Sequence, residues 1–104
     1  MEEIFDRIIQ FQTERDWKKF HTPENLAKSI SIEAAELLEH FQWGKEYNSL
    51  EVGEELADVL IYCLYMADAM DFDVKEIIFD KIKKNAIKYP IDKSKGNAQK
   101  YTEL

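Results

Sequence analysis

Apolar residues recur at the spacing of an α-helix in four separate stretches of the chain. In the first stretch Ile4, Ile8 and Phe11 follow the i, i+4, i+7 pattern, which continues to about Trp17. The third and fourth stretches open with an Asx residue followed three positions later by Glu. The second stretch opens with Thr followed by Pro. Each of these three residue pairs is typical of the start of a helix. The pairs are Thr22–Pro23, Asn48 with Glu51, and Asp73 with Glu76.

We expect the second helix to end near Gly44 and the fourth to end before Pro90, since both residue types interrupt helices. The short connections between the helices favour antiparallel neighbours. The sequence therefore predicts an all-α fold, a four-helix bundle formed by residues 1–90. Residues 91–104 have no apolar period and are predicted to be a polar C-terminal tail.

The third predicted helix carries apolar residues around most of its circumference. They are Leu56, Val59, Leu60, Ile61, Cys63, Leu64, Met66, Ala67 and Met70. A helix of this kind requires burial on all sides, and a chain of 104 residues has few other helices with which to enclose it. We therefore expect a homo-oligomer, either a dimer or a tetramer.

Charge is distributed unevenly along the chain, whose net charge is −7. Nine carboxylates and two lysines lie between Glu24 and Asp58, whereas residues 81–100 contain seven lysines. The acidic excess argues against a nucleic-acid partner, because phosphate backbones are bound by clusters of Lys and Arg. An acidic middle followed by a basic end favours instead a phosphorylated small molecule that carries a divalent metal.

Other features of composition restrict the cellular setting. The chain has no run of about 18 apolar residues, and Met1 is followed by two glutamates, so neither a membrane span nor a signal peptide is expected. A single cysteine, Cys63, excludes an internal disulfide. These features predict a cytoplasmic protein.

Four carboxylates lie on or beside the apolar faces of two predicted helices. Glu33 and Glu36 form an E-x-x-E pair in the second helix, and Glu55 and Asp58 form an E-x-x-D pair in the third. Glu33 interrupts the stripe of Leu26, Ile30 and Leu37, and Glu55 lies among Val52, Val59, Tyr62 and Met66. Burying an unpaired carboxylate is costly, and four together repel one another. A positive charge is therefore expected among them.

The charge could come from lysines or from a metal ion, unless the acids simply form a solvated face of the helices. Lysines could pair with the acids, but none occupies an apolar stripe of these helices. A hard divalent cation fits better, because Mg²⁺, and Mn²⁺ as its substitute, take oxygen ligands and leave positions for water and phosphate. The sequence therefore predicts a metal site formed by the four carboxylates.

The spacing of the two carboxylate pairs resembles that of the MazG-like all-α nucleotide pyrophosphohydrolases. The pattern is E-x-x-E, then 18 intervening residues, then E-x-x-D. Further segments resemble the dCTP pyrophosphatase branch of that family, in the same order along nearly the whole chain. They are RDWKKFHTPENLA (15–27), ELLEHFQW (36–43), EELADVLIY (54–62), KNAIKYP (84–90) and the terminal KYTEL. One departure is that some members place a histidine facing the base in the first helix, where this chain has Ile4, Ile8 and Ile9.

The resemblance implies a Mg²⁺-dependent hydrolase that cleaves a nucleoside triphosphate between its α- and β-phosphates, releasing the monophosphate and pyrophosphate. It implies that Glu33, Glu36, Glu55 and Asp58 hold the metal and form the catalytic centre, with dCTP or a modified dCTP as the expected substrate. Which base is preferred, how many metal ions bind and which glutamate activates water are left open.

Several residues are candidates for holding the nucleotide. Trp17 and Trp43 flank the second helix and could stack on a base, although both could equally be core residues that cap the bundle. The other candidates are His21, Tyr62, Lys81, Asn85 and Lys88, of which His21 and Asn85 match positions of the family pattern. The alternatives are a loop histidine, an interface tyrosine and a solvated lysine face.

Two other functions are compatible with parts of this pattern. A non-enzymatic helical adaptor that dimerises through the third helix would explain the apolar helix and the acidity, but not Glu33 and Glu55 within apolar stripes. A related hydrolase of another nucleotide would keep the metal and change the substrate.

Overall fold

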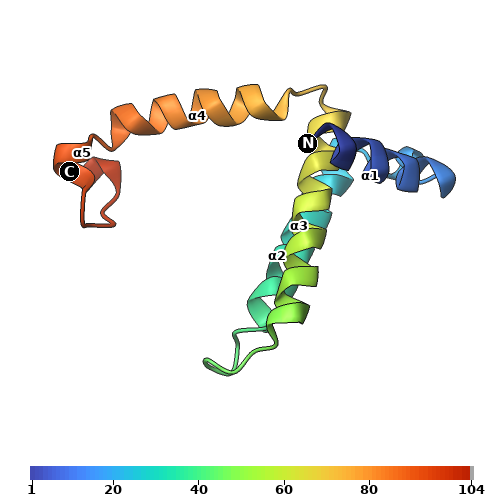
Figure 1. Ribbon diagram of the computed structural model, residues 1–104, viewed down its shortest axis with the longest axis horizontal. Coiled ribbons are helices and arrows are strands. Elements are labelled where there is room, and N and C mark those ends of the chain that lie inside the picture. Colours follow the sequence, from blue (N-terminus) through green and yellow to red (C-terminus); the bar gives the residue numbers. More distant parts are fainter. Residues whose placement is uncertain (104) are drawn as a thin grey trace. The chain divides into compact units, whose positions relative to one another are not determined.

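The computed structural model describes residues 1–103, and among these residues every regular element is a helix. The main helices are α1 (Glu2–Glu14), α2 (Pro23–Glu39), α3 (Ser49–Ala69) and α4 (Val74–Lys88), followed by the short α5 (Ile91–Ser94). Two 3₁₀ turns, η1 (Lys18–Phe20) and η2 (Tyr101–Glu103), complete the set (Figure 1). The predicted all-α class is confirmed.

The predicted helix starts are those that the structure shows. The Thr22 Oγ1 atom accepts a hydrogen bond from the Asn25 amide at 3.3 Å, at the start of α2. The Asn48 side chain caps α3 by accepting from the amides of Leu50 and Glu51. Asp73 caps α4 in the same way, through the Glu76 amide at 2.9 Å. Each cap satisfies an amide that has no partner within its own helix.

Two helices end earlier than the apolar pattern predicts. The first was expected to reach about Trp17, but α1 ends at Glu14 because Asp16 adopts the left-handed conformation, with φ of 54°. The second was expected to continue to near Gly44, but α2 ends at Glu39. Beyond it, the backbone amides of residues 40–42 bond to carbonyls three residues back, which tightens the chain into turns.

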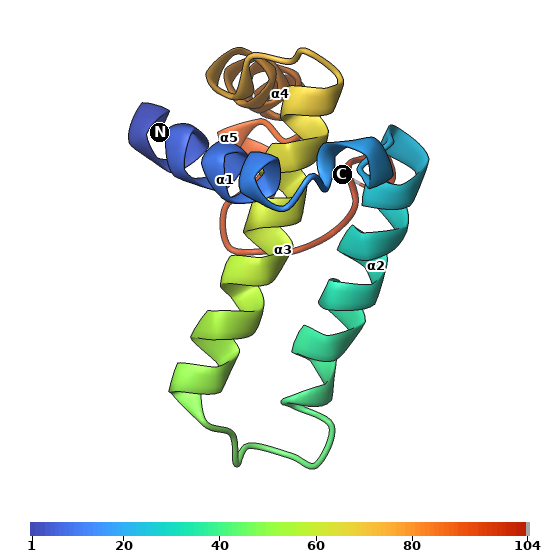
Figure 2. The same ribbon diagram turned by 90° about the vertical axis from the view of Figure 1, so that its right-hand side faces the viewer.

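The chain divides into two compact units, Met1–Asp71 and Phe72–Leu104. In the first unit α2 and α3 form a long antiparallel pair, and α1 crosses the C-terminal part of α3 (Figure 2). Leu26 of α2 is fully buried, and Tyr65 of α3 is nearly so. The Tyr65 hydroxyl donates a hydrogen bond to the Ile8 carbonyl at 2.7 Å, which attaches α1 to α3.

A substantial part of the apolar surface of α2 and α3 stays exposed. Ile32 and Leu38 on α2 and Leu56 and Leu60 on α3 are all exposed, Leu60 by 53%. The third helix is therefore only partly enclosed within its own unit, as its apolar circumference predicts.

The second unit contains α4 and the residues that follow it. None of the residues of α4 is buried. Tyr89 and Tyr101 pack edge to face with ring centroids 6.1 Å apart, and the Lys88 ammonium lies 4.8 Å from the centre of the Tyr101 ring. The segment predicted to be a polar tail thus contains α5 and η2, and its Tyr101 contacts the end of α4.

None of the helices in residues 1–103 combines the length and the apolar character needed to cross a membrane.

Candidate functional site

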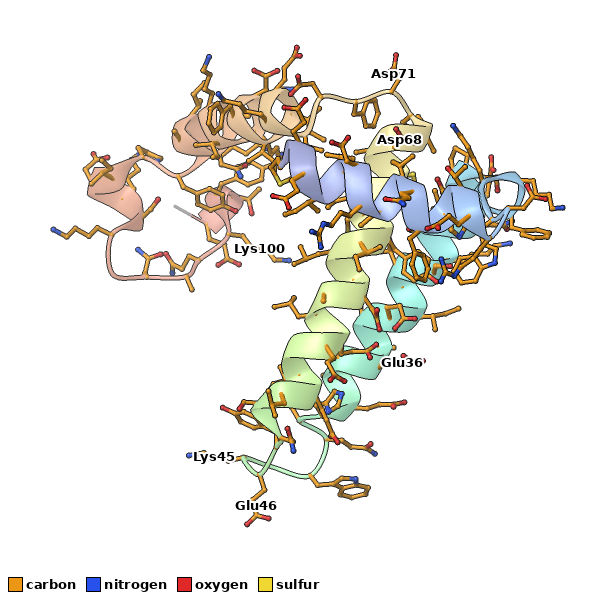
Figure 3. The ribbon with its side chains drawn as sticks, turned by 45° about the vertical axis from the view of Figure 1, so that its right-hand side comes forward. Glu36, Lys45, Glu46, Asp68, Asp71 and Lys100 are labelled. Atoms are coloured by element: carbon orange, nitrogen blue, oxygen red, sulfur yellow. The ribbon has the colours of Figure 1, made fainter. Side chains whose placement is uncertain are left out.

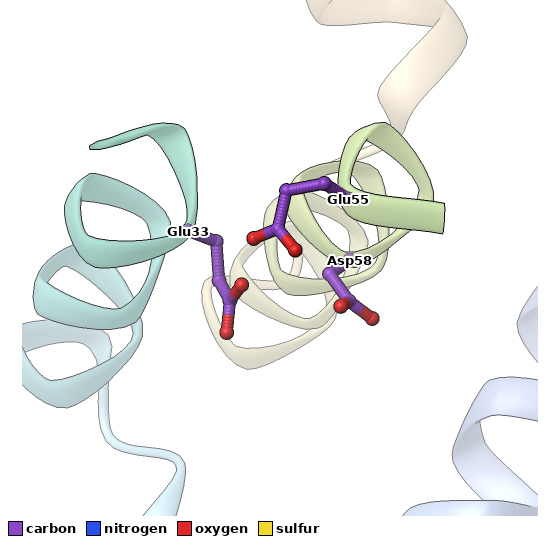
Figure 4. A group of neighbouring side chains, drawn as sticks. All are labelled: Glu33, Glu55 and Asp58. Atoms are coloured by element: carbon purple, nitrogen blue, oxygen red, sulfur yellow. The ribbon is translucent and has the colours of Figure 1, made fainter. Parts of the chain in front are cut away.

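Three of the four predicted carboxylates meet between α2 and α3. Glu33 projects from α2 toward Glu55 and Asp58 of α3 (Figure 4). One carboxylate oxygen from each of the three lies within 4.8 Å of the other two. Glu33 and Glu55 are half-buried, whereas Asp58 is exposed at the edge of the group. We refer to these three residues as the acidic cluster.

Helix geometry explains why this cluster forms. Residues three apart lie on neighbouring positions of one helix face, so Glu55 and Asp58 project from α3 in similar directions. Glu33 belongs to the α2 stripe that contains the buried Leu26, and this stripe packs against α3. The apolar contacts that join the two helices therefore also bring the carboxylates together.

No basic side chain of residues 1–103 forms an ion pair with the acidic cluster. Among residues 1–103 the ion pairs are Arg7 with Glu3 and Lys19 with Asp16, both on the surface and outside the cluster. The Glu33 Oε2 and Glu55 Oε1 atoms are sealed from solvent, and no described residue hydrogen bonds to either of them. Buried oxygen atoms without partners carry a desolvation cost that a bound cation would remove.

The pKa of Glu33 is raised because the carboxylates of the acidic cluster lie close together. Two ionised carboxylates have no donor between them, but a proton on Glu33 allows a hydrogen bond to the Glu55 carboxyl. This bond, desolvation, a bond to Glu36 and the charges of Glu55 and Glu36 raise the pKa of Glu33 to about 8. Without a cation, the cluster relieves its repulsion by keeping a proton on Glu33.

Glu36 lies outside the three-residue group. It is exposed on α2, one turn beyond Glu33, and its carboxyl contributes to the raised pKa of Glu33 (Figure 3). The structure thus brings together Glu33, Glu55 and Asp58, with Glu36 at their margin. The donors are all carboxylate oxygens, the set that suits a hard divalent cation such as Mg²⁺ or Mn²⁺.

An aromatic pocket of about 360 Å³ adjoins the acidic cluster. Its walls come from α1, from α3 and from Trp17 and His21, which lie at the two ends of η1. Asp58 belongs both to the acidic cluster and to the pocket wall. The complete lining is Arg7, Ile8, Phe11, Trp17, His21, Asp58, Ile61, Tyr62 and Tyr65. Flat rings on several sides make the pocket suitable for a planar ligand.

The rings of the pocket are in mutual contact. The His21 ring centroid lies 6.2 Å from that of Trp17 and 6.1 Å from that of Tyr62. Burial and the charges of Glu33, Asp58 and Glu36 raise the pKa of the Tyr62 hydroxyl. Tyr62 therefore lies where the pocket and the acidic cluster meet, and its hydroxyl stays protonated and able to donate.

The remaining predicted nucleotide-binding residues lie elsewhere. Trp43 is 86% exposed in the loop between α2 and α3, at the end of the pair opposite α1, where Lys45 and Glu46 also lie (Figure 3). Trp43 is not part of the pocket wall. Lys81, Asn85 and Lys88 belong to α4, in the second unit.

Sequence reasoning missed several residues of the pocket wall. Arg7, Ile8, Phe11, Ile61 and Tyr65 line the pocket but were not predicted as site residues. Phe11 belongs to the apolar stripe of the first helix, and Ile8 is also one of the positions at which some family members place a histidine facing the base. A further sequence signal existed for Tyr65, which is one helical turn beyond Tyr62 and two beyond Asp58, on the same face of α3.

The cluster and the pocket together suit one kind of ligand. A cation held by carboxylates attracts anionic oxygens, and an adjoining aromatic wall accepts a flat ring. A molecule that carries both a ring system and a phosphate chain could occupy both parts at once.

Comparisons with known proteins agree with this description. The dCTP pyrophosphatase 1 of Mus musculus is 37% identical over 116 aligned residues, which cover all of this chain and 67% of the mouse protein. The dCTP pyrophosphatase 1 of Homo sapiens is 34% identical over 114 residues, with the same two coverages. A crystal structure of a pyrophosphatase from Archaeoglobus fulgidus superimposes with a TM-score of 0.81 and 46% identity, covering 86% of this chain and 92% of the other.

The family assignment follows from two independent matches. Residues 28–104 match the MazG-like family, and this range contains the whole acidic cluster. The relatives named above extend the similarity to the full chain. The resemblance seen in the sequence is confirmed, and the chain belongs to the MazG-like family.

Proposed function

We propose that this protein is a divalent-metal-dependent nucleoside triphosphate pyrophosphohydrolase. The observation that carries the proposal is that Asp58 belongs to both the acidic cluster and the wall of the aromatic pocket. A nucleotide whose base enters the pocket would therefore present its phosphates at the carboxylates. The relatives named as pyrophosphatases support this reaction class.

We further propose dCTP, or a deoxycytidine triphosphate with a modified base, as the substrate. The support is the name of the relatives, dCTP pyrophosphatase 1, together with the size and planarity of the pocket. The reaction would break the anhydride bond between the α- and β-phosphates. Water would add to one phosphorus atom of this bond, and the products would be the nucleoside monophosphate and pyrophosphate.

The acidic cluster fits the cation that this reaction requires. Glu33, Glu55 and Asp58 would hold Mg²⁺, with Mn²⁺ as a substitute, and Glu36 would join them. When bound, such an ion neutralises phosphate charge and lowers the pKa of coordinated water. The orphaned Glu33 and Glu55 oxygens support this assignment, because they lack any other partner among residues 1–103.

The protein's own groups would orient the substrate and move the proton. Trp17 would stack on the base, and the Tyr62 hydroxyl would donate a hydrogen bond to a phosphate or sugar oxygen beside the cluster. A glutamate carboxylate of the site would take the proton of the attacking water. Trp43, Lys81, Asn85 and Lys88 are proposed as additional nucleotide contacts, with the lysines pairing with phosphate oxygens.

We also propose that the active form is a homo-oligomer, a dimer or a tetramer. Exposed apolar residues on both helices that hold the cluster, among them Ile32 and Leu60, support this proposal. Apolar surface of this extent on a small domain is typical of subunit interfaces. The alternative, a non-enzymatic adaptor, would use the same surface. It gives no reason for the sealed Glu33 and Glu55 oxygens, which have no partner among residues 1–103.

The proposed reaction is tested by product analysis. The purified protein with Mg²⁺ is incubated with dCTP, 5-methyl-dCTP and the other canonical deoxynucleoside triphosphates, and the products are resolved by ion-exchange chromatography. We expect dCMP and pyrophosphate in equal amounts from dCTP, no reaction in excess EDTA, and recovery on adding Mg²⁺ or Mn²⁺. Release of diphosphate and inorganic phosphate, or full activity in EDTA, would contradict the proposal.

Single carboxylates can be neutralised with little change of shape by Glu33→Gln and Asp58→Asn. We expect each to lower kcat/KM by roughly 10²-fold or more, the scale of losing a key electrostatic group. Without metal, each variant should be at least as stable as the wild type, because like-charge repulsion is relieved. The measurements are steady-state kinetics and thermal unfolding in EDTA.

The matched control for these variants is Asp68→Asn. Asp68 is an exposed aspartate near the C-terminal end of the same helix α3, outside the cluster (Figure 3). We expect this variant to keep wild-type kinetics. If instead Glu33→Gln and Asp58→Asn lose about 3 kcal/mol of stability, and activity falls only in proportion to folded protein, the acids are structural partners of buried cations.

The raised pKa of Glu33 predicts how stability depends on pH. In the metal-free folded state Glu33 keeps its proton up to about pH 8, whereas in the unfolded chain it loses the proton near 4.5. Between these values the unfolded chain binds fewer protons, so the free energy of unfolding should fall as pH rises.

Urea unfolding in EDTA across this pH range measures the effect. Glu33→Gln should flatten the dependence, and millimolar Mg²⁺ should restore stability at pH 8 by binding the ionised cluster. A metal-free wild type whose stability is constant or rises over the range would show that the carboxyls do not crowd one another.

The oligomer is tested by multi-angle light scattering at micromolar concentration. We expect a mass of two or four chains rather than the 12.3 kDa of one. Leu60→Lys should shift the mass toward the monomer, because it places a charge within the exposed apolar surface of α3. Glu51→Lys, at an exposed polar position on the same helix, is the control and should leave the mass unchanged.

A further inference from the structure

Gln12 of α1 is the one polar side chain buried in the part of the chain that the structure describes, residues 1–103, with 2% of its surface exposed. Its Nε2 amide lies 2.7 Å from the His21 Nδ1 atom. Its Oε1 atom is sealed from solvent, and no described residue donates to it. A buried amide with an unmet acceptor is costly, and an apolar side chain of the same size would avoid that cost. Packing alone therefore does not explain a glutamine at this position.

The contact with Gln12 determines the state of the His21 ring. A neutral imidazole has one N–H donor and one bare nitrogen that accepts. The Gln12 Nε2 atom can only donate, so a hydrogen bond at this contact requires Nδ1 to be the bare nitrogen and places the ring proton on Nε2. Burial also lowers the pKa of His21, which favours the neutral ring.

The remaining nitrogen of His21 is available to the aromatic pocket. His21 lines this pocket, whereas Gln12, which holds Nδ1, does not. Nε2 has no hydrogen-bond partner among residues 1–103 and is not one of their sealed, unpartnered atoms. The nearby Tyr65 hydroxyl, by contrast, already donates to the Ile8 carbonyl. His21 therefore offers this pocket a directed donor in addition to the Tyr62 hydroxyl, which lies at the end of the pocket beside the acidic cluster.

We propose that Gln12 is a positioning residue that holds His21 in the tautomer whose Nε2–H donates to a lone-pair acceptor on the nucleobase. This inference rests on the proposed function, in which the pocket receives the base of a nucleoside triphosphate. The acceptor would be a carbonyl oxygen or an unprotonated ring nitrogen. A base that turned an N–H group toward His21 would place donor against donor and would bind poorly.

The tautomer can be measured without any substrate. Two-dimensional ¹⁵N–¹H correlation spectra of the full chain in EDTA distinguish protonated from bare imidazole nitrogens. We expect His21 to show a bare Nδ1 and a protonated Nε2, while His40, the other histidine, serves as an internal comparison. A protonated Nδ1 at His21 would overturn the inference, whatever the enzyme proves to hydrolyse.

The effect on recognition is tested with Gln12→Met, which removes the amide and keeps the length of the side chain. The substrates are dCTP and the triphosphate of abasic deoxyribose, both with Mg²⁺. We expect KM for dCTP to rise roughly fivefold to tenfold with little change in kcat, the scale of one lost hydrogen bond. The kcat/KM for the abasic triphosphate should not change, because it has no base to recognise.

Two controls separate positioning from packing. Gln10→Met alters an exposed glutamine of the same helix and should leave both substrates unaffected. In a His21→Phe background, Gln12→Met should have no further effect on KM, since its action passes through the imidazole. An effect that persists in that background, or one equal for both substrates, would overturn the inference.

Two further outcomes are informative. If Gln12→Met fails to fold, Gln12→Leu is the second apolar replacement for the same measurements. A wild type that hydrolyses neither substrate overturns the proposed function and the nucleobase contact with it. A normal wild-type rate with an unaffected Gln12→Met overturns only the inference drawn here.

Discussion

Repulsion among three carboxylates that packing forces together is the constraint on which this structure depends. Glu33, Glu55 and Asp58 place oxygens within 4.8 Å of one another, and no basic side chain of residues 1–103 pairs with them. The apolar contacts between α2 and α3 oppose this repulsion and hold the acids in place. Protonation of Glu33 relieves part of the repulsion, as its raised pKa indicates. A divalent cation would relieve it more fully, so the same arrangement that weakens the metal-free fold favours metal binding.

The helix α3 connects the two halves of the site. Its Glu55 and Asp58 face α2, while Asp58, Tyr62 and Tyr65 also form one wall of the aromatic pocket beneath α1. Because successive helical turns are about 5.4 Å apart, a ligand that spans cluster and pocket contacts neighbouring turns of one rigid element. The hydrogen bond from Tyr65 to the Ile8 carbonyl fixes α1 against this wall. The spacing between Asp58, Tyr62 and Tyr65 is therefore fixed within one helix, whereas Glu33 and Trp17 are brought to it by the packing of other elements.

The aromatic pocket, unlike the acidic cluster, contains few polar groups. Most of its wall is apolar or aromatic, and its histidine is held from behind by a glutamine buried to 98%. In a mostly apolar pocket, a few polar groups determine the orientation of the ligand, because few other donors and acceptors compete for it. In the proposed oligomer, a second copy of the chain would cover the exposed apolar residues of α2 and α3.

The sequence by itself determined the helical class, the starts of α2, α3 and α4, and the presence of acids on apolar faces. These are local properties, because caps and periodicity depend on residues three or four positions apart. It did not determine where α1 and α2 end, since the left-handed Asp16 and the turns after Glu39 have no apolar signature. Only the tertiary structure showed that three of the four acids converge, that Trp43 lies outside the pocket, and that Gln12 bonds to His21. The reason is physical: contacts between residues on different helices depend on how the helices cross, and that crossing is decided by packing over the whole unit rather than by any one segment.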